Sequence, residues 1–233
     1  MTRFDAFALL SLLAAAASAA CQADDHPSPL AAAAVAGRTD TLARLLDGGA
    51  DPNERSTRGI TVLGLAARSG RVAVIEQLVR AGADPNLRDR TENEWTPMIH
   101  AVHTHQRASV QALLRLGADP NLGGGVTPLI MAAGYGNSSM VQLLLDGGAD
   151  PSRTLKSGEN ALGAAVTGSG DVGGWTVGTC QTDTVNLLLA RAPTLPVEAA
   201  WLARPMLWPA RLRGCDEILR LVQGRQGTRR AAR

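Results

Sequence analysis

Four copies of one five-residue motif constrain the fold of this chain more than any other feature. Gly-Ala-Asp-Pro-Asn occupies residues 49–53, 82–86 and 117–121, and Gly-Ala-Asp-Pro-Ser occupies residues 148–152. Successive copies begin 33, 35 and 31 residues apart. A period of this length is typical of a solenoid, in which each period is one supersecondary unit that stacks on its neighbours. Each period is therefore expected to hold one such unit.

The stretch 127–152 indicates what the unit is. Thr127 can cap a helix, and Pro128 suits the first helical position because its missing N–H would have no partner there. A short apolar stretch follows and ends at Gly136. A second helix over 139–146 places apolar residues three and four positions apart on one face, and the Gly-Gly and Asp-Pro after it favour a helix end and a turn. Each period is predicted to form helix, turn, helix and a projecting turn.

These units resemble ankyrin repeats. First helices begin T-V-L-G-L-A-A at Thr61, T-P-M-I-H-A at Thr96 and T-P-L-I-M-A-A at Thr127, which is similar to the ankyrin signature T-P-L-H-x-A-A, and G-A-D-x-N completes it. The resemblance covers about residues 28–222. It implies an all-α solenoid of five clear stacked repeats and a degenerate sixth as carboxyl-terminal cap, with β-hairpin fingers and first helices lining a concave surface.

The amino terminus is predicted to be a signal peptide over residues 1–20. Arg3 precedes an apolar stretch over 6–20, which is shorter than a bilayer-spanning helix, and small residues precede Cys21. A cytoplasmic protein with a hydrophobic amino-terminal helix is the alternative. Export places the mature chain in the periplasm.

Cys21 raises the question of a membrane anchor. Cleavage before it resembles the processing of bacterial lipoproteins, in which the new terminal cysteine is acylated, but Ser18 stands where that family prefers a branched apolar residue. Two outcomes stay open: a lipid on Cys21 that holds the protein on the outer membrane, and plain cleavage with release. Residues 21–27 form a short linker in either case.

The fifth repeat carries an insertion at about 168–180. Ala165 and Val185 are 20 residues apart, where the other repeats use eight. The insertion is either a plain loop or a binding element specific to this protein. After the sixth repeat, residues 223–233 form a basic tail without apolar periodicity, which predicts disorder.

Two further cysteines, Cys180 and Cys215, lie at the end of the insertion and in the last repeat. Disulfides persist in exported chains, so a Cys180–Cys215 bond is predicted, with two separate thiols as the alternative.

No catalytic or cofactor motif is found. The net charge of +2 gives no reason to expect nucleic acid, and the Gly triplet at 123–125 lacks the Lys and helix of a phosphate loop, which favours a flexible finger tip. His100 and His103 are spaced to meet one metal ion with His105 nearby, but no Cys or carboxylate flanks them at a familiar spacing. We therefore predict neither metal, cofactor nor enzymatic activity.

The ankyrin resemblance implies a monomer that binds one protein partner through finger tips and exposed first-helix positions. An immunity or inhibitor protein against a secreted toxin, and an accessory protein for a periplasmic redox enzyme such as a catalase, are the alternatives. Trp95 either contacts the partner or packs the hairpin before Thr96. The predicted partner-binding residues are Arg58, Arg88, Arg90, Glu94, Trp95, His100, His103, Met131, Tyr135, Arg153 and Lys156.

Overall fold

A computed structural model describes residues 28–167 and 181–195, and within them the chain folds into five helix pairs. The first helices of the pairs are α2 (Pro29–Ala36), α4 (Val62–Arg68), α6 (Pro97–His103), α8 (Pro128–Gly134) and α10 (Ala161–Thr167). The second helices are α3 (Thr39–Asp47), α5 (Val72–Arg80), α7 (Arg107–Arg115), α9 (Ser138–Asp146) and α11 (Thr182–Arg191).

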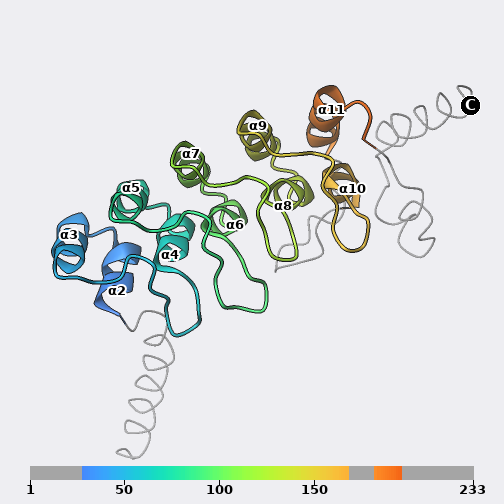
Figure 1. The fold of residues 1–233 in the computed structure, drawn as a ribbon. Helices are drawn as coiled ribbons and strands as arrows, with labels where there is room; N and C mark the ends of the chain where they lie inside the picture. Colours follow the sequence, from blue (N-terminus) through green and yellow to red (C-terminus); the bar gives the residue numbers. More distant parts are fainter. Residues whose placement is uncertain (1–27, 168–180, 196–233) are drawn as a thin grey trace, which may run out of the picture.

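The pairs stack in series, as Figure 1 shows. First helices form one row, in which α4 contacts α2 and α6, and α8 contacts α6 and α10. Second helices form a parallel row, and long loops project from the side of the first helices. The described residues contain no β-sheet, and the antiparallel bridges Arg55–Thr61 and Thr154–Asn160 are isolated. The predicted all-α solenoid of stacked repeats is confirmed.

Side-chain caps begin the first helices. The Oγ1 atoms of Thr61, Thr96 and Thr127 accept hydrogen bonds from the backbone N–H three residues later, at 3.0, 3.4 and 3.3 Å. Such a cap satisfies an N–H that has no partner within the helix. Ser28 and Asn160 do the same for α2 and α10. The cap predicted at Thr127 is confirmed.

The core runs along the whole stack between the two rows of helices. Every residue of α8 is buried, because this helix is covered by its neighbours in the row and by its own second helix. The second helices bury one face only; α5, for example, buries Val74, Ile75 and Leu78. Apolar burial is therefore shared between repeats, and no pair can fold its core alone.

The repeated motif bonds each repeat to the next. Asn53 Nδ2 donates to Gly82 O (3.1 Å), and Asn53 Oδ1 accepts from Asp84 N–H (2.8 Å). Asn86 bonds in the same way to Gly117 O and Asp119 N–H at 3.4 and 2.8 Å. We call this pair of bonds an asparagine clamp.

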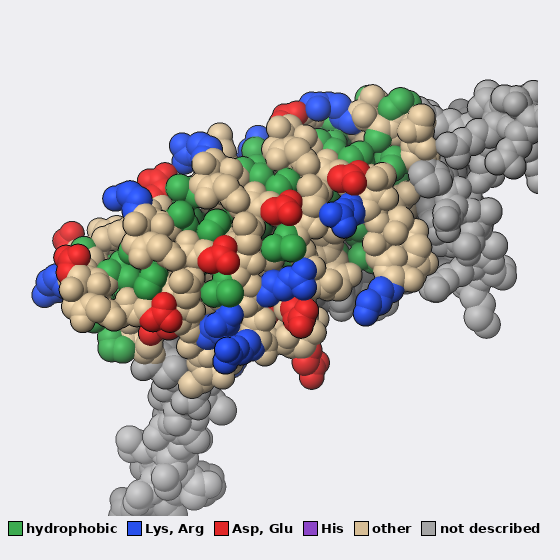
Figure 2. Space-filling model, viewed as in Figure 1, with side chains coloured by type: hydrophobic (Ala, Val, Ile, Leu, Met, Phe, Trp, Pro, Cys, Tyr) green, Lys and Arg blue, Asp and Glu red, His purple; other side chains and the backbone are tan. Residues whose placement is uncertain are grey.

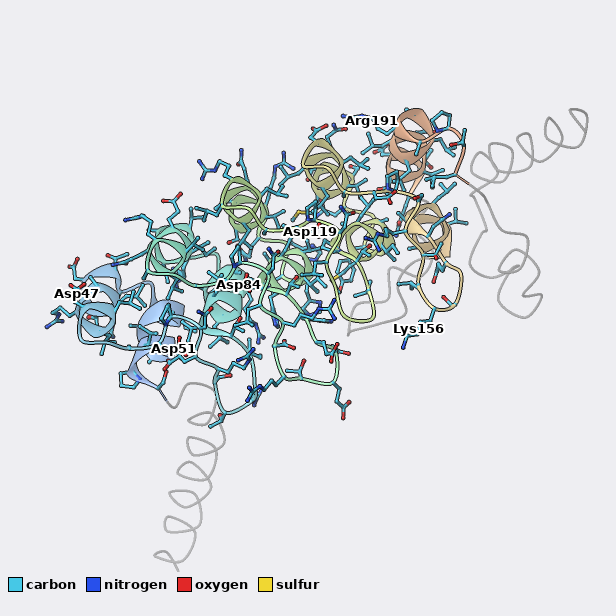
Figure 3. The ribbon with its side chains drawn as sticks, viewed as in Figure 1. Asp47, Asp51, Asp84, Asp119, Lys156 and Arg191 are labelled. Carbon is cyan, nitrogen blue, oxygen red and sulfur yellow. The ribbon has the colours of Figure 1, made fainter. Side chains whose placement is uncertain are left out.

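A third clamp joins Asn121 to Gly148 O and Asp150 N–H, at 3.2 and 2.6 Å. Figure 3 shows Asp51, Asp84 and Asp119 at equivalent places in successive repeats. The motif therefore ends one helix pair and also grips the following copy of itself.

No helix among residues 28–167 and 181–195 is long and apolar enough to cross a membrane. Several predictions fall on residues outside these ranges. They are the signal peptide over 1–20, the lipid on Cys21, the linker over 21–27, the insertion at 168–180, the Cys180–Cys215 bond, the sixth repeat and the tail over 223–233.

Candidate protein-binding surface

Four loops project beside the first helices, and we number them as fingers. The first, second, third and fourth fingers are residues 54–61, 87–96, 122–127 and 153–160. The first and fourth are short turns closed by local main-chain bonds. Ser56 N–H donates to Ile60 O at 2.8 Å, and Leu155 N–H donates to Glu159 O at 2.8 Å.

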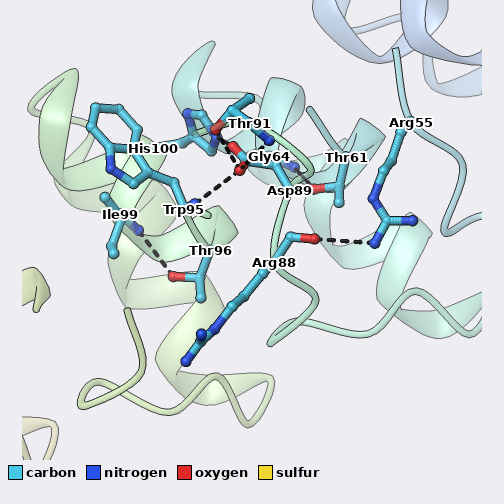
Figure 4. Close-up of polar contacts among 10 residues, drawn as sticks. All are labelled: Arg55, Thr61, Gly64, Arg88, Asp89, Thr91, Trp95, Thr96, Ile99 and His100. Atoms are coloured by element: carbon cyan, nitrogen blue, oxygen red, sulfur yellow. Dashed lines mark hydrogen bonds and ion pairs between the residues drawn. The ribbon is translucent and has the colours of Figure 1, made fainter. Parts of the chain in front are cut away.

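The second finger is built around the carboxylate of Asp89, as Figure 4 shows. Asp89 Oδ1 accepts from Thr91 Oγ1 (2.7 Å), Thr91 N–H (3.3 Å) and Trp95 N–H (2.9 Å). His100 Nε2 of α6 lies 2.9 Å from Asp89 Oδ2. Asp89 is only 4% exposed, so one buried carboxylate holds both arms of the finger and fixes them to a helix.

The protonation of Asp89 follows from these contacts. Burial alone would raise its pKa, but the hydrogen bonds from His100 and Thr91 outweigh burial and lower the pKa below its ordinary value of 3.8. The carboxylate is therefore charged at neutral pH and is a strong acceptor for the N–H and O–H groups around it.

The second finger is also fixed to both of its neighbours. Arg90 N–H donates to Gly59 O (2.9 Å), and Arg55 Nη2 donates to Arg88 O (3.1 Å), which joins it to the first finger. On the other side, a Cβ on Gly124 would lie 1.9 Å from Asn93 O. At Gly124 the third finger thus packs backbone against backbone, whereas a Cβ on Gly125 would have nothing within 4 Å. The flexibility of the Gly tip stays a prediction.

A row of aromatic side chains runs from the second finger along the first helices. The Trp95 ring lies edge-to-face with His100 at 5.2 Å and tilted against His103 at 4.9 Å, measured between ring centroids. His103 Nδ1 lies 2.7 Å from the Tyr135 hydroxyl, and the Tyr135 and His105 rings are 5.2 Å apart. We call these five residues the aromatic row.

Comparison with protein families agrees with this architecture. The model for ankyrin repeats in three copies matches residues 4–89 and 30–124, and the model for a single ankyrin repeat matches residues 124–154. The chain belongs to the ankyrin-repeat family. No curated protein matches it. Ankyrin domains are in general non-catalytic binding modules, and the repeats of this chain imply a protein-binding scaffold.

The ankyrin surface holds the predicted partner-binding residues in three states of exposure. Exposed side chains are Arg58, Arg88, Arg90, Glu94, Arg153 and Lys156. Half-buried side chains are Trp95, His103 and Tyr135. Figure 2 shows Lys and Arg side chains, with Asp and Glu side chains beside them, below α4 and α6, where the first two fingers project.

His100 and Met131 are buried, at 5% and 8% exposure. Their predicted surface exposure is wrong. Both lie in the middle of first helices that are covered by the neighbouring helices of the row, and His100 is covered further by Trp95 and Asp89 of the second finger. His100 supports the finger from below.

The exposed residues fall into two places. Arg58, Arg88, Arg90 and Glu94 share the first and second fingers, where Arg88 Nη1 and Glu94 Oε2 form an ion pair at 3.4 Å. Lys156 lies at the tip of the fourth finger, as Figure 3 shows. The contacts between fingers described above do not extend to the fourth.

The histidines have other partners than a metal ion. His100 bonds to Asp89, and His103 bonds to Tyr135. Within residues 28–167 and 181–195 no three His, Cys, Asp or Glu side chains lie close enough to hold a metal ion.

The role of Asp89 in holding the second finger together was not predicted from the sequence. Asp followed two positions later by Thr is the pattern of an Asx turn, in which the side chain accepts from the backbone ahead of it. The bonds between Asp89 and Thr91 could therefore have been predicted from the sequence. The bond to His100 could not, because it joins a loop to a helix eleven positions further on.

Proposed function

We propose that this ankyrin protein is an exported, non-enzymatic binder of one protein partner, which docks on the first and second fingers and the aromatic row. The observation that carries the proposal is the second finger: a rigid loop that presents exposed arginines beside half-buried Trp95 and Tyr135.

The composition of this surface supports a protein partner. Aromatic and Arg side chains dominate the binding energy of protein interfaces, and only 3% of this chain is aromatic. Trp95, His103 and Tyr135 are nevertheless in one row. Because Asp89 already orders the finger, a partner would bind without the entropic cost of ordering a loop.

Affinity capture tests the surface. The purified chain would be used to recover partners from extracts of its own cells, beside a variant with Arg88→Ala, Arg90→Ala and Tyr135→Ala. The matched control carries Arg44→Ala and Arg80→Ala, at exposed positions of the second helices α3 and α5. We expect the control to recover the partner and the finger variant to lose it. Equal recovery by both variants would refute the surface.

Export is a separate part of the proposal, and it rests on residues 1–20 and Cys21. Cell fractionation with labelled palmitate tests it. The native chain is expected in the cell envelope and carrying the label, and Cys21→Ser is expected to remove the label only. Recovery of the unprocessed chain in the cytoplasm would contradict export, whereas a released and unlabelled chain would contradict lipidation alone.

A further inference from the structure

An open groove of about 530 Å³ lies between the first two fingers. Arg55, Arg58 and Arg90 line it. Among the described residues the exposed side chain of Arg90 makes no hydrogen bond or ion pair, since only its backbone N–H is bonded. Arg55 Nη2 donates to Arg88 O, and Arg55 Nε is buried and has no hydrogen-bond partner within residues 28–167 and 181–195.

Ser56 adds a second unsatisfied group to the groove wall. It is 6% exposed, and its Oγ has no hydrogen-bond partner among the described residues. A buried polar group without a partner is unfavourable, and such groups in native structures generally call for an explanation. Here two of them, on adjacent residues, line one basic groove.

The acidic residues of the groove are already engaged. Glu54 accepts a hydrogen bond from the Ser28 hydroxyl, and Asp51 Oδ1 accepts from Asn53 N–H at 2.8 Å. Their bonds hold the start of the first finger in place. The groove therefore has more donors than acceptors, and an arriving ligand should supply an acceptor.

We propose that the groove binds a side-chain carboxylate from an acidic segment of the protein partner. This inference rests on the proposed function and names the chemistry of its partner. A carboxylate can accept two parallel bonds from one guanidinium, which gives both strength and orientation. The bonds from Arg90 N–H to Gly59 O and from Arg55 Nη2 to Arg88 O fix the distance between the two fingers in advance.

An acidic peptide fits this groove better than nucleic acid does. Nucleic-acid binding relies on a basic stripe that follows many phosphates. The groove is short, Asp51 and Glu54 lie within it, and the whole chain has a net charge of only +2. The groove is therefore too short to follow many phosphates, whereas the side-chain carboxylate of one residue can bond to the arginines while the rest of a peptide extends into solvent.

Binding of a synthetic hexaglutamate peptide to the full chain tests the proposal. NMR titration at low salt would follow the backbone amides, with hexaglutamine as the uncharged control. We expect shifts in residues 54–60 and 88–91 with hexaglutamate only, and weaker binding at high salt because exposed charges are screened. R90Q should weaken binding about tenfold, since a charge-assisted bond is lost. R153Q on the fourth finger should change it by less than about twofold.

Several results would contradict the proposal that the groove binds a carboxylate. They are no hexaglutamate binding at low salt, equal binding by R90Q and the native chain, equal binding of hexaglutamine, and tighter binding of an oligothymidine of six nucleotides. R90Q replaces a side chain that makes no hydrogen bond or ion pair among the described residues and keeps the backbone N–H bond to Gly59 O, so its spectrum should otherwise match that of the native chain.

Affinity capture separates this proposal from the function on which it rests. If the R90Q chain recovers the same partner as well as the native chain does, the carboxylate groove is refuted while partner binding stands. If the native chain recovers no partner, the proposed function fails, and the peptide titration decides independently whether the groove binds carboxylates.

Discussion

The middle of the stack and its carboxyl-terminal end are joined to their neighbours in different ways. In the middle, Asn53, Asn86 and Asn121 each clamp the next copy of the motif. The fourth copy has Ser152, whose hydroxyl bonds back to Asp150 at 2.6 Å within the same copy. The side chain at the fifth position of the motif therefore bonds forward to the next copy in the first three copies and inward to its own copy in the fourth.

The next repeat explains this difference. In all three clamps the residue whose carbonyl accepts from the asparagine is a left-handed glycine, since Gly82, Gly117 and Gly148 have φ of 97°, 88° and 90°. The corresponding residue after the fourth copy is Ala192, with φ −138°. A residue with a Cβ rarely adopts the left-handed conformation. An asparagine at position 152 would therefore not find the backbone geometry that the other three clamps use. Each copy of the motif is therefore matched to the copy that follows it.

Loss of Asp89 should give the largest difference between the two regions. Asp89→Ala leaves buried His100 and two partly buried backbone N–H groups without their acceptor, and breaking a buried pair costs about 3 kcal/mol of unfolding free energy. Asp150→Ala at the exposed end of the stack is the control, with an expected loss under about 1 kcal/mol. Urea denaturation followed by circular dichroism measures both. Similar losses would mean that the buried carboxylate contributes no more than an exposed one.

Removal of one clamp should have the next largest effect. Asn86→Ala deletes a donor and an acceptor that join two repeats, worth about 1 to 2 kcal/mol together. Ser152→Ala deletes bonds within one copy only and should cost about 0.5 kcal/mol or less. The same denaturation experiment compares them. If Ser152→Ala proves the more damaging, clamps are not what holds neighbouring repeats together.

Acid should remove a smaller part of the stability that Asp89 provides. Its pKa in the folded chain lies below 3.8, so the folded state favours the charged form and gains stability from it above that pH. That contribution is lost as the pH falls through the folded pKa.

The measurement is the difference in unfolding free energy between the native chain and Asp89→Asn from pH 7 to pH 2. It should be constant above about pH 5 and shrink in acid. Asp146 and Asp150 have pKa values lowered by hydrogen bonds from Gln142 and Ser152, but both chains contain them, so they cancel. A difference that grows in acid would mean that the pKa of Asp89 is raised in the folded chain, not lowered.

The period and the helix caps could be predicted from sequence because both depend on neighbours close along the chain. Thr127 and Pro128 specify a helix start by themselves, and they form one. The clamps could not be predicted this way. An asparagine in a turn ordinarily bonds to its own backbone, and the partner of Asn53 lies 29 residues away.

The candidate site was only half predictable for the same reason. Residue type placed Arg58, Arg88 and Arg90 correctly at the surface, since long cations stay exposed. His100 is buried instead, because Trp95 and Asp89 of the second finger pack against it. Their positions follow from the path of the finger, which sequence spacing does not specify.

His105→Gly should give a small gain in the middle of the stack. His105 has φ 58°, where the equivalent residues of neighbouring repeats, Gly70 and Gly136, have φ of 71° and 67°. Relief of this strain is worth up to about 1 kcal/mol, less the ring contact with Tyr135. Thermal unfolding would show a slightly raised Tm. His105→Ala keeps the strain and loses the ring, so it should lower Tm, and a gain from both variants would exclude backbone strain as the cause.

Ser152→Asn should change stability least, by less than about 0.5 kcal/mol, and it tests the comparison most directly. The substitution restores the motif of the other three copies but meets Ala192 in place of a left-handed glycine. The new amide should therefore stay in solvent and gain no bonds to the next repeat. Adding Ala192→Gly supplies the missing conformation, and a gain by the double variant beyond the sum of the single ones would show that the two ends of a clamp depend on each other. The opposite result would be that Ser152→Asn alone stabilises the chain as much as Asn86→Ala destabilises it. In that case the conformation of residue 192 would not matter, and the difference between the middle and the end of the stack would come from the side chain at position 152 alone.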